Sequence, residues 1–286
     1  MIRSRSTSRS QGVALMAVLW LLAVLSLLAA TVATLSMSSR REATDNTPIE
    51  RLELLADSTI RLTILKVIAA PRTRDGAMSL DSQFSVFDTS VTVNIELENG
   101  RIDLNTAADD LLFAFFMANG WSESEARILV ARIADWKDPD DTTRTGGAEL
   151  PEYLAASKKY GPRNAPFEAV EELRQVLGAE TLKPGLLDSF TVYTHAVMPA
   201  EYAASPPVKA ALAWADANEL GDHPWLRGSA GQPVSISAGD LVGQIVRIHA
   251  CARQTRIQTC REAVVRPVGQ PNYPFQVFLW RSHPWG

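Results

Sequence analysis

Cysteine and histidine are scarce in this sequence. Two cysteines, Cys251 and Cys260, and four histidines occur among 286 residues. The cysteine spacing matches no zinc or redox motif, and no nucleophile-elbow, zinc-protease or P-loop signature occurs. We therefore find no catalytic set and expect that the protein is not an enzyme. In an oxidising compartment Cys251 and Cys260 could close a hairpin disulfide, and two unpaired thiols are the alternative.

The sequence also lacks a surplus of basic charge. Lysine and arginine total 28 against 32 aspartates and glutamates, which gives a formal net charge of −4 and a pI of about 5.7. A nucleic-acid-binding domain needs a positively charged face for its phosphate contacts. The composition therefore argues against a nucleic-acid partner.

One long segment near the N-terminus has no charged residue at all, from Ser10 until Arg40. Its apolar part, residues 13–35, is about 23 residues long, enough for a helix to cross a bilayer core of ~30 Å. A secretory signal peptide has an apolar region of only ~7–15 residues. The sequence therefore predicts a retained membrane anchor, with cleavage among the small residues 29–33 as the alternative.

The left edge of this apolar run contains a candidate processing site. A short basic leader ends at Gly12, and a cut before Val13 would remove the leader and keep the helix. This leader resembles that of type IV pilins and type II secretion pseudopilins, which a prepilin peptidase cuts on the cytoplasmic side. Most of that family has Glu as the fifth residue after the cut, where this sequence has Ala17. The missing Glu resembles the K-type minor pseudopilin, which is placed at the tip of the fibre.

After the anchor, the expected elements follow an informative order. Helical spacing continues to about Ala70, and alternating apolar residues over 91–97 predict a half-buried strand before the turn at 99–100. Because one strand cannot form a stable sheet alone, the later strands must complete its sheet. The order therefore predicts an α+β fold with a helical insertion, and two consecutive domains are the alternative. The other expected elements are helices from Ala107 (capped by Asn105 and Thr106), over 122–136, 167–173 and 208–219, and strands over 241–252, 263–268 and 275–280.

Acidic residues concentrate in one predicted loop. Residues 135–141 include four aspartates, and Glu149 follows after two glycines. Such charges repel one another unless they are solvated or neutralised, and Ca²⁺ takes six to eight oxygen ligands. Counted from Asp138, Asp140 and Glu149 occupy the third and twelfth positions of an EF-hand loop, but threonines fill the fifth and sixth. The pattern predicts an irregular Ca²⁺ loop, with a solvated acidic turn as the alternative.

Two segments, residues 101–107 and 167–173, resemble the starts of helix-hairpin-helix units. Many such units bind DNA through a Gly-rich hairpin whose N–H groups hold a phosphate. Here the hairpin, residues 119–124, has one glycine, no lysine and the nearby acids Glu123 and Glu125. A structural helical module is therefore favoured, and a membrane-anchored DNA-uptake protein is the alternative.

Taken in order, the motifs at 101–107, 134–141, 147–149, 164–173 and 190–194 resemble the type II secretion minor pseudopilin K family. The resemblance implies a pilin-like fold, in which a long N-terminal helix packs on a small antiparallel sheet, with a large inserted all-helical domain. It also implies Ca²⁺ binding in the insertion, by Asp138, Asp140, Asp141 and Glu149, with Asp135 as a further candidate. The implied division is a leader (1–12), a transmembrane segment (13–36), helix and first strand (37–100), a helical, helix-hairpin-helix or SAM-like insertion (101–195), a loop-rich connection (196–239) and C-terminal strands (240–286).

The same resemblance implies a function in assembly. The protein would sit in the inner membrane with most of its chain in the periplasm, and would enter the pseudopilus as its tip subunit. The implied partners are the I-, J- and H-type minor pseudopilins and the prepilin peptidase, with no nucleic acid and no small-molecule substrate. The insertion would cap the fibre so that no further subunit could be added above it.

Overall fold

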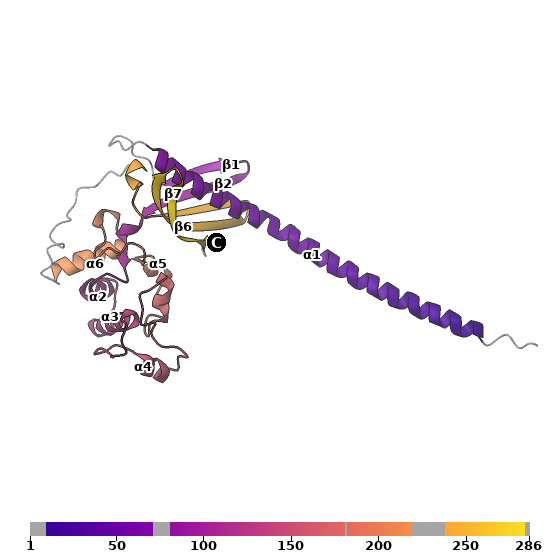
Figure 1. Cartoon of the computed structure of the whole chain (residues 1–286), viewed down its shortest axis with the longest axis horizontal. Coiled ribbons are helices and arrows are strands. Elements are labelled where there is room, and N and C mark those ends of the chain that lie inside the picture. The colour runs from indigo at the N-terminus through magenta and orange to yellow at the C-terminus, as the bar shows by residue number, and fades with distance from the viewer. Residues whose placement is uncertain (1–9, 71–80, 181, 219–237, 284–286) are drawn as a thin grey trace, which may run out of the picture.

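The computed structural model describes residues 10–70, 81–180, 182–218 and 238–283. Within these ranges the side chains of residues 10–15, 17, 29, 31–47, 81 and 184 are not described. A long helix, α1 (Ser10–Ala69), extends away from the body of the molecule, and its C-terminal part packs on a sheet (Figure 1). The expected helix of residues 13–70 is thus present and runs without a break through Pro48.

The packed half of α1 follows from its apolar spacing. Residues three and four positions apart fall on one face of a helix, and five of them on α1 are almost completely buried: Leu52, Ala56, Ile60, Ile64 and Val67. Burying each large aliphatic side chain contributes about 1.5–3 kcal/mol. This stripe therefore fixes α1 against the sheet.

The expected membrane span at residues 13–35 lies within α1, and the side chains of residues 13–15, 17, 29 and 31–35 fall outside the described ones. Among the described residues, the structure contains no helix whose length and apolarity suffice to cross a bilayer. The predicted prepilin cleavage site between Gly12 and Val13 lies within α1, and the side chains of both residues are likewise not described.

The sheet has five antiparallel strands in the order β1-β2-β5-β6-β7. On β2, alternate residues are buried against α1, among them Val91, Val93 and Ile95. The edge strand β1 was not expected from the sequence, and its described side chains are mostly exposed. The strands are β1 (Asp81–Val86), β2 (Thr89–Leu97), β5 (Val246–Gln254), β6 (Ile257–Gln270) and β7 (Tyr273–His283).

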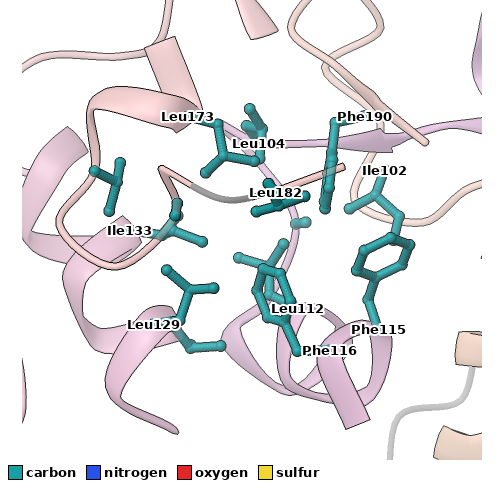
Figure 2. Close-up of a cluster of buried hydrophobic side chains, with 14 of the residues drawn as sticks. Ile102, Leu104, Leu112, Phe115, Phe116, Leu129, Ile133, Leu173, Leu182 and Phe190 are labelled. Atoms are coloured by element: carbon teal, nitrogen blue, oxygen red, sulfur yellow. The ribbon is translucent and has the colours of Figure 1, made fainter. Parts of the chain in front are cut away.

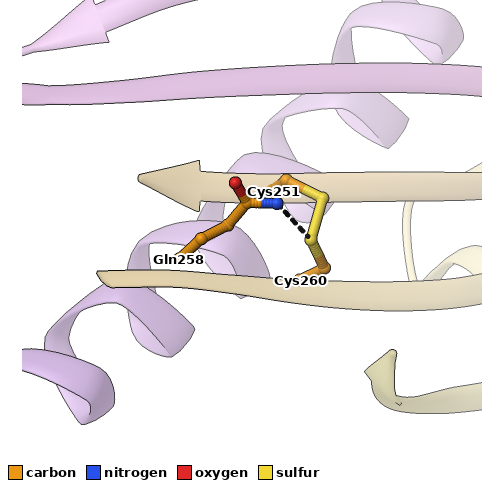
Figure 3. Close-up of a disulfide and its surroundings, with 3 residues drawn as sticks. All are labelled: Cys251, Gln258 and Cys260. Atoms are coloured by element: carbon orange, nitrogen blue, oxygen red, sulfur yellow. Dashed lines mark hydrogen bonds between the residues drawn. A yellow bond between two sulfur atoms is a disulfide. The ribbon is translucent and has the colours of Figure 1, made fainter. Parts of the chain in front are cut away.

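Cys251 and Cys260, expected to form a bridge, are joined by a disulfide in the structure. They are register partners on β5 and β6 with their Cα atoms 4.1 Å apart. The amide Nε2 of Gln258 donates to the sulfur of Cys260 at 3.6 Å (Figure 3). The disulfide links the two strands of the β5–β6 hairpin.

The helical part is inserted between two neighbouring strands. Leu97, at the end of β2, is the register partner of Val246, at the start of β5, so the chain leaves the sheet and returns to the adjacent position. The elements of the insertion are η1 (Glu98–Gly100), β3 (Ile102–Asp103), α2 (Asp109–Ala118), α3 (Glu123–Lys137), α4 (Leu150–Ala155), η2 (Val170–Gln175), α5 (Pro184–Leu187), β4 (Phe190–Thr191), η3 (Glu201–Ala203), α6 (Pro206–Ala217) and η4 (Ala238–Leu241).

The insertion has its own hydrophobic core, separate from that of the sheet. In Figure 2, Leu112 and Phe116 of α2 face Leu129 and Ile133 of α3, and Phe190 of β4 completes the cluster. The core extends past the expected boundary at residue 195, because α6 packs on α2. The rings of Phe113 and Trp214 lie 5.7 Å apart, edge to face.

The predicted cap at Asn105 and Thr106 is wrong. Helix α2 begins at Asp109, with Ala108 at its N-cap. The Asn105 amide instead donates to the carbonyl of Phe167 at 3.0 Å and accepts from its N–H at 2.8 Å, while the Thr106 hydroxyl donates to Ala196 O at 2.8 Å. Both side chains therefore serve tertiary contacts. The helix expected over 167–173 is also different, since a short 3₁₀ helix forms at Val170–Gln175.

A row of ion pairs with alternating charge ties the insertion to the sheet. Buried Arg247 on β5 makes two hydrogen bonds to Glu98, at 2.7 and 2.9 Å, and pairs with buried Glu262 on β6. Arg281 on β7 bonds Glu262 at 2.8 Å and pairs with Glu171 of η2.

At the other end of this row of ion pairs, Arg101 bridges Glu96 and Glu98. The hydroxyl of Thr191 also donates to Glu98 at 2.6 Å. The network holds both domains at their junction.

Candidate functional site

The acidic loop lies between two helices that deliver its first and last carboxylates. Asp135 is in the last turn of α3, Asp138 is the C-cap of α3, and Glu149 is the N-cap of α4. The ring of Trp136 is buried 6.1 Å from the rings of both Tyr153 and Phe167. This aromatic packing anchors the end of α3 against α4 and holds the two ends of the loop together.

Asp135 organises the loop from within. Its carboxylate is fully buried, and its Oδ2 atom accepts the backbone N–H groups of Arg144 at 3.2 Å and of Ala148 at 2.9 Å. A Cβ atom on Gly147 would lie 1.9 Å from the same oxygen, so the backbone approaches more closely than any other residue permits. Burial raises the pKa of Asp135, and the two N–H donors oppose that rise.

Glu149 is a buried acid without a partner. Its side chain is 2% exposed, and neither carboxylate oxygen has a hydrogen-bond partner in the structure. Burial is the largest cause, and together with the nearby charges of Asp135, Asp138, Asp141 and Asp140 it raises the pKa of Glu149 to about 7. Oδ1 atoms of Asp135 and Asp138 are also buried without a hydrogen bond. Because buried polar groups are nearly always paired, these oxygens are suited to bind a cation.

Asp140 and Asp141 shape the outer turn of the loop. Asp140 accepts the N–H of Thr142 at 2.8 Å, and Asp141 accepts from the Asn164 amide at 2.8 Å. Both aspartates are exposed, unlike Asp135 and Glu149. In the part of the chain that the structure describes, no three His, Cys, Asp or Glu side chains are grouped closely enough to hold a metal. The structure thus brings the five predicted acids to one loop without closing them around a point.

The sequence interpretation missed two residues of this loop. Arg144 contacts three aspartates, as detailed below. Asn164 has a positive φ of 51° and donates to both Asp140 O, at 3.2 Å, and Asp141. A single arginine within an acidic loop was a signal available in the sequence. The contact of Asn164 was not, because it lies 23 residues from Asp141.

The hairpin suspected of holding a DNA phosphate is already satisfied by an acid. Ser122 caps α3, and Glu125 accepts the Ser122 N–H at 3.0 Å and its hydroxyl at 2.6 Å. These contacts lower the pKa of Glu125, the hydroxyl being the stronger influence. A negative side chain therefore occupies the helix N-terminus where a phosphate would bind.

Comparison with known proteins finds a family model that matches the first part of the insertion. A family model described as "Type II secretion system (T2SS), protein K" matches residues 94–184, which include the acidic loop. Residues 94–184 are thus similar to protein K of the type II secretion system. The family consists of pseudopilins, structural components of the secretion machinery that are not known as enzymes.

A solved structure shares the fold of this chain. It is the crystal structure of the GspK-GspI-GspJ complex from the enterotoxigenic Escherichia coli type 2 secretion system. The match has a TM-score of 0.62 at 14% sequence identity, and covers 85% of this chain and 99% of that chain. The comparison with curated proteins finds no match.

Proposed function

We propose that this protein is a minor pseudopilin that caps the tip of the periplasmic pseudopilus and supports protein export across the outer membrane. The observation that carries the proposal is the insertion of a whole helical domain between adjacent strands β2 and β5 of a sheet packed on α1. The domain lies at the end of the molecule far from the start of α1 (Figure 1). Its bulk at that end would block addition of another subunit.

The N-terminal part of the chain supports the same one-sided role. Prepilin peptidase would cut between Gly12 and Val13, and the apolar run would keep the protein in the inner membrane with its bulk in the periplasm. Ala17 stands where most pilins have Glu. The subunit would thus lack the carboxylate that contacts a neighbour above, while its helix still packs on those below. The disulfide between Cys251 and Cys260 suits an oxidising periplasm.

The partners follow from the same assembly. In the E. coli complex the similar chain is found with GspI and GspJ. We propose I-, J- and H-type minor pseudopilins as partners of this chain, packed through their long helices below it. The insertion would then be the part of the complex that projects from the fibre.

Calcium is the cation that the acidic loop fits best. All candidate donors are hard oxygens, which Ca²⁺ prefers, and Glu149 offers two that are unpartnered. We propose that Asp138, Asp140, Asp141 and Glu149 hold the ion, with Asp135 either bound or supporting the loop. The ion would neutralise their repulsion and stabilise the joint between α3 and α4.

The position in the fibre can be tested by labelling. An epitope tag on this protein, in pseudopili assembled from its own system, is expected to bind gold-labelled antibody at one end only. The same tag on the major pseudopilin should label the whole length and serves as the control. Labelling along the fibre would refute the tip position. N-terminal sequencing with and without prepilin peptidase should give Val13 only when the peptidase is present.

A further inference from the structure

We infer that Arg144 is the resident counter-ion of the acidic loop, and that its guanidinium and a divalent cation compete for the same carboxylates. This inference rests on the proposed calcium site. The guanidinium contacts Asp138 Oδ2 at 3.3 Å through Nη2, Asp135 Oδ1 at 3.4 Å through Nε, and Asp109 Oδ2 at 3.4 Å through Nη1. Two of these three acids belong to the proposed ligand set.

The contacts of Arg144 are those of an exchangeable group. Strong charge-assisted hydrogen bonds measure about 2.7–2.9 Å, and all three contacts of Arg144 are longer. The side chain is 48% exposed, so the guanidinium is already partly hydrated and can move fully into water. Asp109 lies on α2, outside the ligand set, and would remain as a partner after the other two acids are released.

Arg144 neutralises the loop only in part. One guanidinium faces Asp135 and Asp138, and both oxygens of buried Glu149 remain without a donor. Lys137, the other cation of this segment, donates its Nζ to Leu104 O at 2.9 Å. A divalent cation would satisfy more oxygens than Arg144 does, and would therefore displace it.

The backbone of Arg144 has a separate role that its side chain does not share. Its N–H donates to Asp135 Oδ2, and this bond survives any substitution other than proline. Removing the guanidinium should therefore leave this backbone bond in place and remove only the ion pairs of the side chain. In the protein as it stands, Arg144 lowers the affinity of the loop for a cation and keeps the loop folded when cations are scarce.

The test is calorimetric titration of the full-length protein in detergent with CaCl₂, together with its melting temperature in chelator. Arg144→Gln is expected to bind Ca²⁺ about five- to tenfold more tightly, since the weak ion pairs no longer compete. Its melting temperature in chelator should fall, and saturating Ca²⁺ should restore it to that of wild type. Arg144→Lys, which keeps the charge, should lie between the two.

Arg163→Gln is the matched control, because Arg163 pairs with Glu168 and Glu172 and with none of the proposed ligands. It should bind Ca²⁺ as wild type does. Tight binding by Arg144→Gln with weaker or undetectable binding by wild type supports the competition. If wild type binds and Arg144→Gln binds no more tightly, the competition is refuted and the calcium site stands. If no folded variant binds, both the site and the competition are refuted.

Discussion

At the scale of single residues, the acidic loop depends on contacts that tolerate little change. Asp135 is buried and holds two backbone N–H groups, while Gly147 lets the backbone approach its Oδ2 atom. Glu149 lies buried beside these charges without a donor. The loop is therefore closely packed around the carboxylate of Asp135, whereas the carboxylate of Glu149 has no hydrogen-bond donor.

Gly147→Ala tests the close packing. A Cβ atom would lie 1.9 Å from Asp135 Oδ2, so the loop must shift. We expect the free energy of unfolding of the helical domain to fall by about 1–3 kcal/mol, the usual cost of overpacking. Gly185→Ala is the control, since a Cβ there meets no atom within 4 Å. Chemical denaturation should separate the two variants, and equal stability would show that the loop adapts freely.

Glu149→Gln tests the unsatisfied charge. Ionised Glu149 is disfavoured in the folded protein, whereas in the unfolded chain the same carboxylate is solvated by water. A neutral amide at this position should therefore stabilise the calcium-free state. We expect a gain of about 1–2 kcal/mol at pH 8 in chelator, together with loss of the stabilisation by Ca²⁺. Glu123→Gln, at an exposed i,i+4 pair, should change stability by less than about 0.5 kcal/mol. Thermal unfolding measures both, and a destabilised Glu149→Gln in chelator would contradict the argument.

At the scale of elements, the junction between insertion and sheet is a buried ion network. Burial is the largest influence on the pKa of Glu98 and raises it, but the charges of Arg247 and Arg101 and the hydrogen bonds from Arg247 and Thr191 together lower the pKa below its ordinary value. Burial likewise opposes Arg247 and Arg281 at Glu262, whose pKa is also lowered. The ionised carboxylates therefore stabilise the junction.

A lowered carboxylate pKa fixes the sign of the acid response. The stabilisation is complete above the ordinary pKa of 4.5 and is lost as the pH falls below that value. Wild type should lose stability steeply below pH 4.5, whereas Glu98→Gln should already be about 3 kcal/mol less stable at pH 7 and respond less to acid. Glu96→Gln, at a 47% exposed side chain, is the control and should stay within about 1 kcal/mol of wild type. Denaturation at several pH values gives the comparison.

At the scale of the whole molecule, the two domains have separate hydrophobic cores, so we expect their stabilities to respond to different treatments. The helical core is linked to the acidic loop through Trp136 and Tyr153, and the disulfide between Cys251 and Cys260 joins two strands of the sheet. The ion network and the ring contact of Tyr193 with Phe278 join the two domains. Assembly would use α1 and the sheet, whereas the insertion would remain free to cap the fibre.

Calorimetric unfolding of the full-length protein should therefore show two transitions. Chelator is expected to lower the transition of the helical domain and leave that of the sheet unchanged. Reducing the disulfide should do the reverse, at a cost of about 2 kcal/mol for a short closed loop. A single transition that both treatments shift equally would show that the network couples the domains into one unit.

Local patterns in the sequence were enough to determine several parts of this protein. The stripe from Leu52 to Val67 predicted the packed half of α1, alternation over 91–97 predicted β2, and the order of elements predicted a helical insertion. The acids from Asp135 to Glu149 marked the loop. These predictions succeed because helix and strand periodicities depend on residues close together in the chain.

Only the tertiary structure decided which distant groups meet. Glu98 and Arg247 are 149 residues apart, and the Asn105 side chain bonds Phe167, 62 residues away, instead of capping a helix. Burial of Glu149 without a partner, and the placement of Arg144 between Asp109 and Asp138, likewise depend on how α2, α3 and α4 pack. Composition shows that charges are present. Their partners and burial depend on the packing of elements far apart in sequence, which no local pattern encodes.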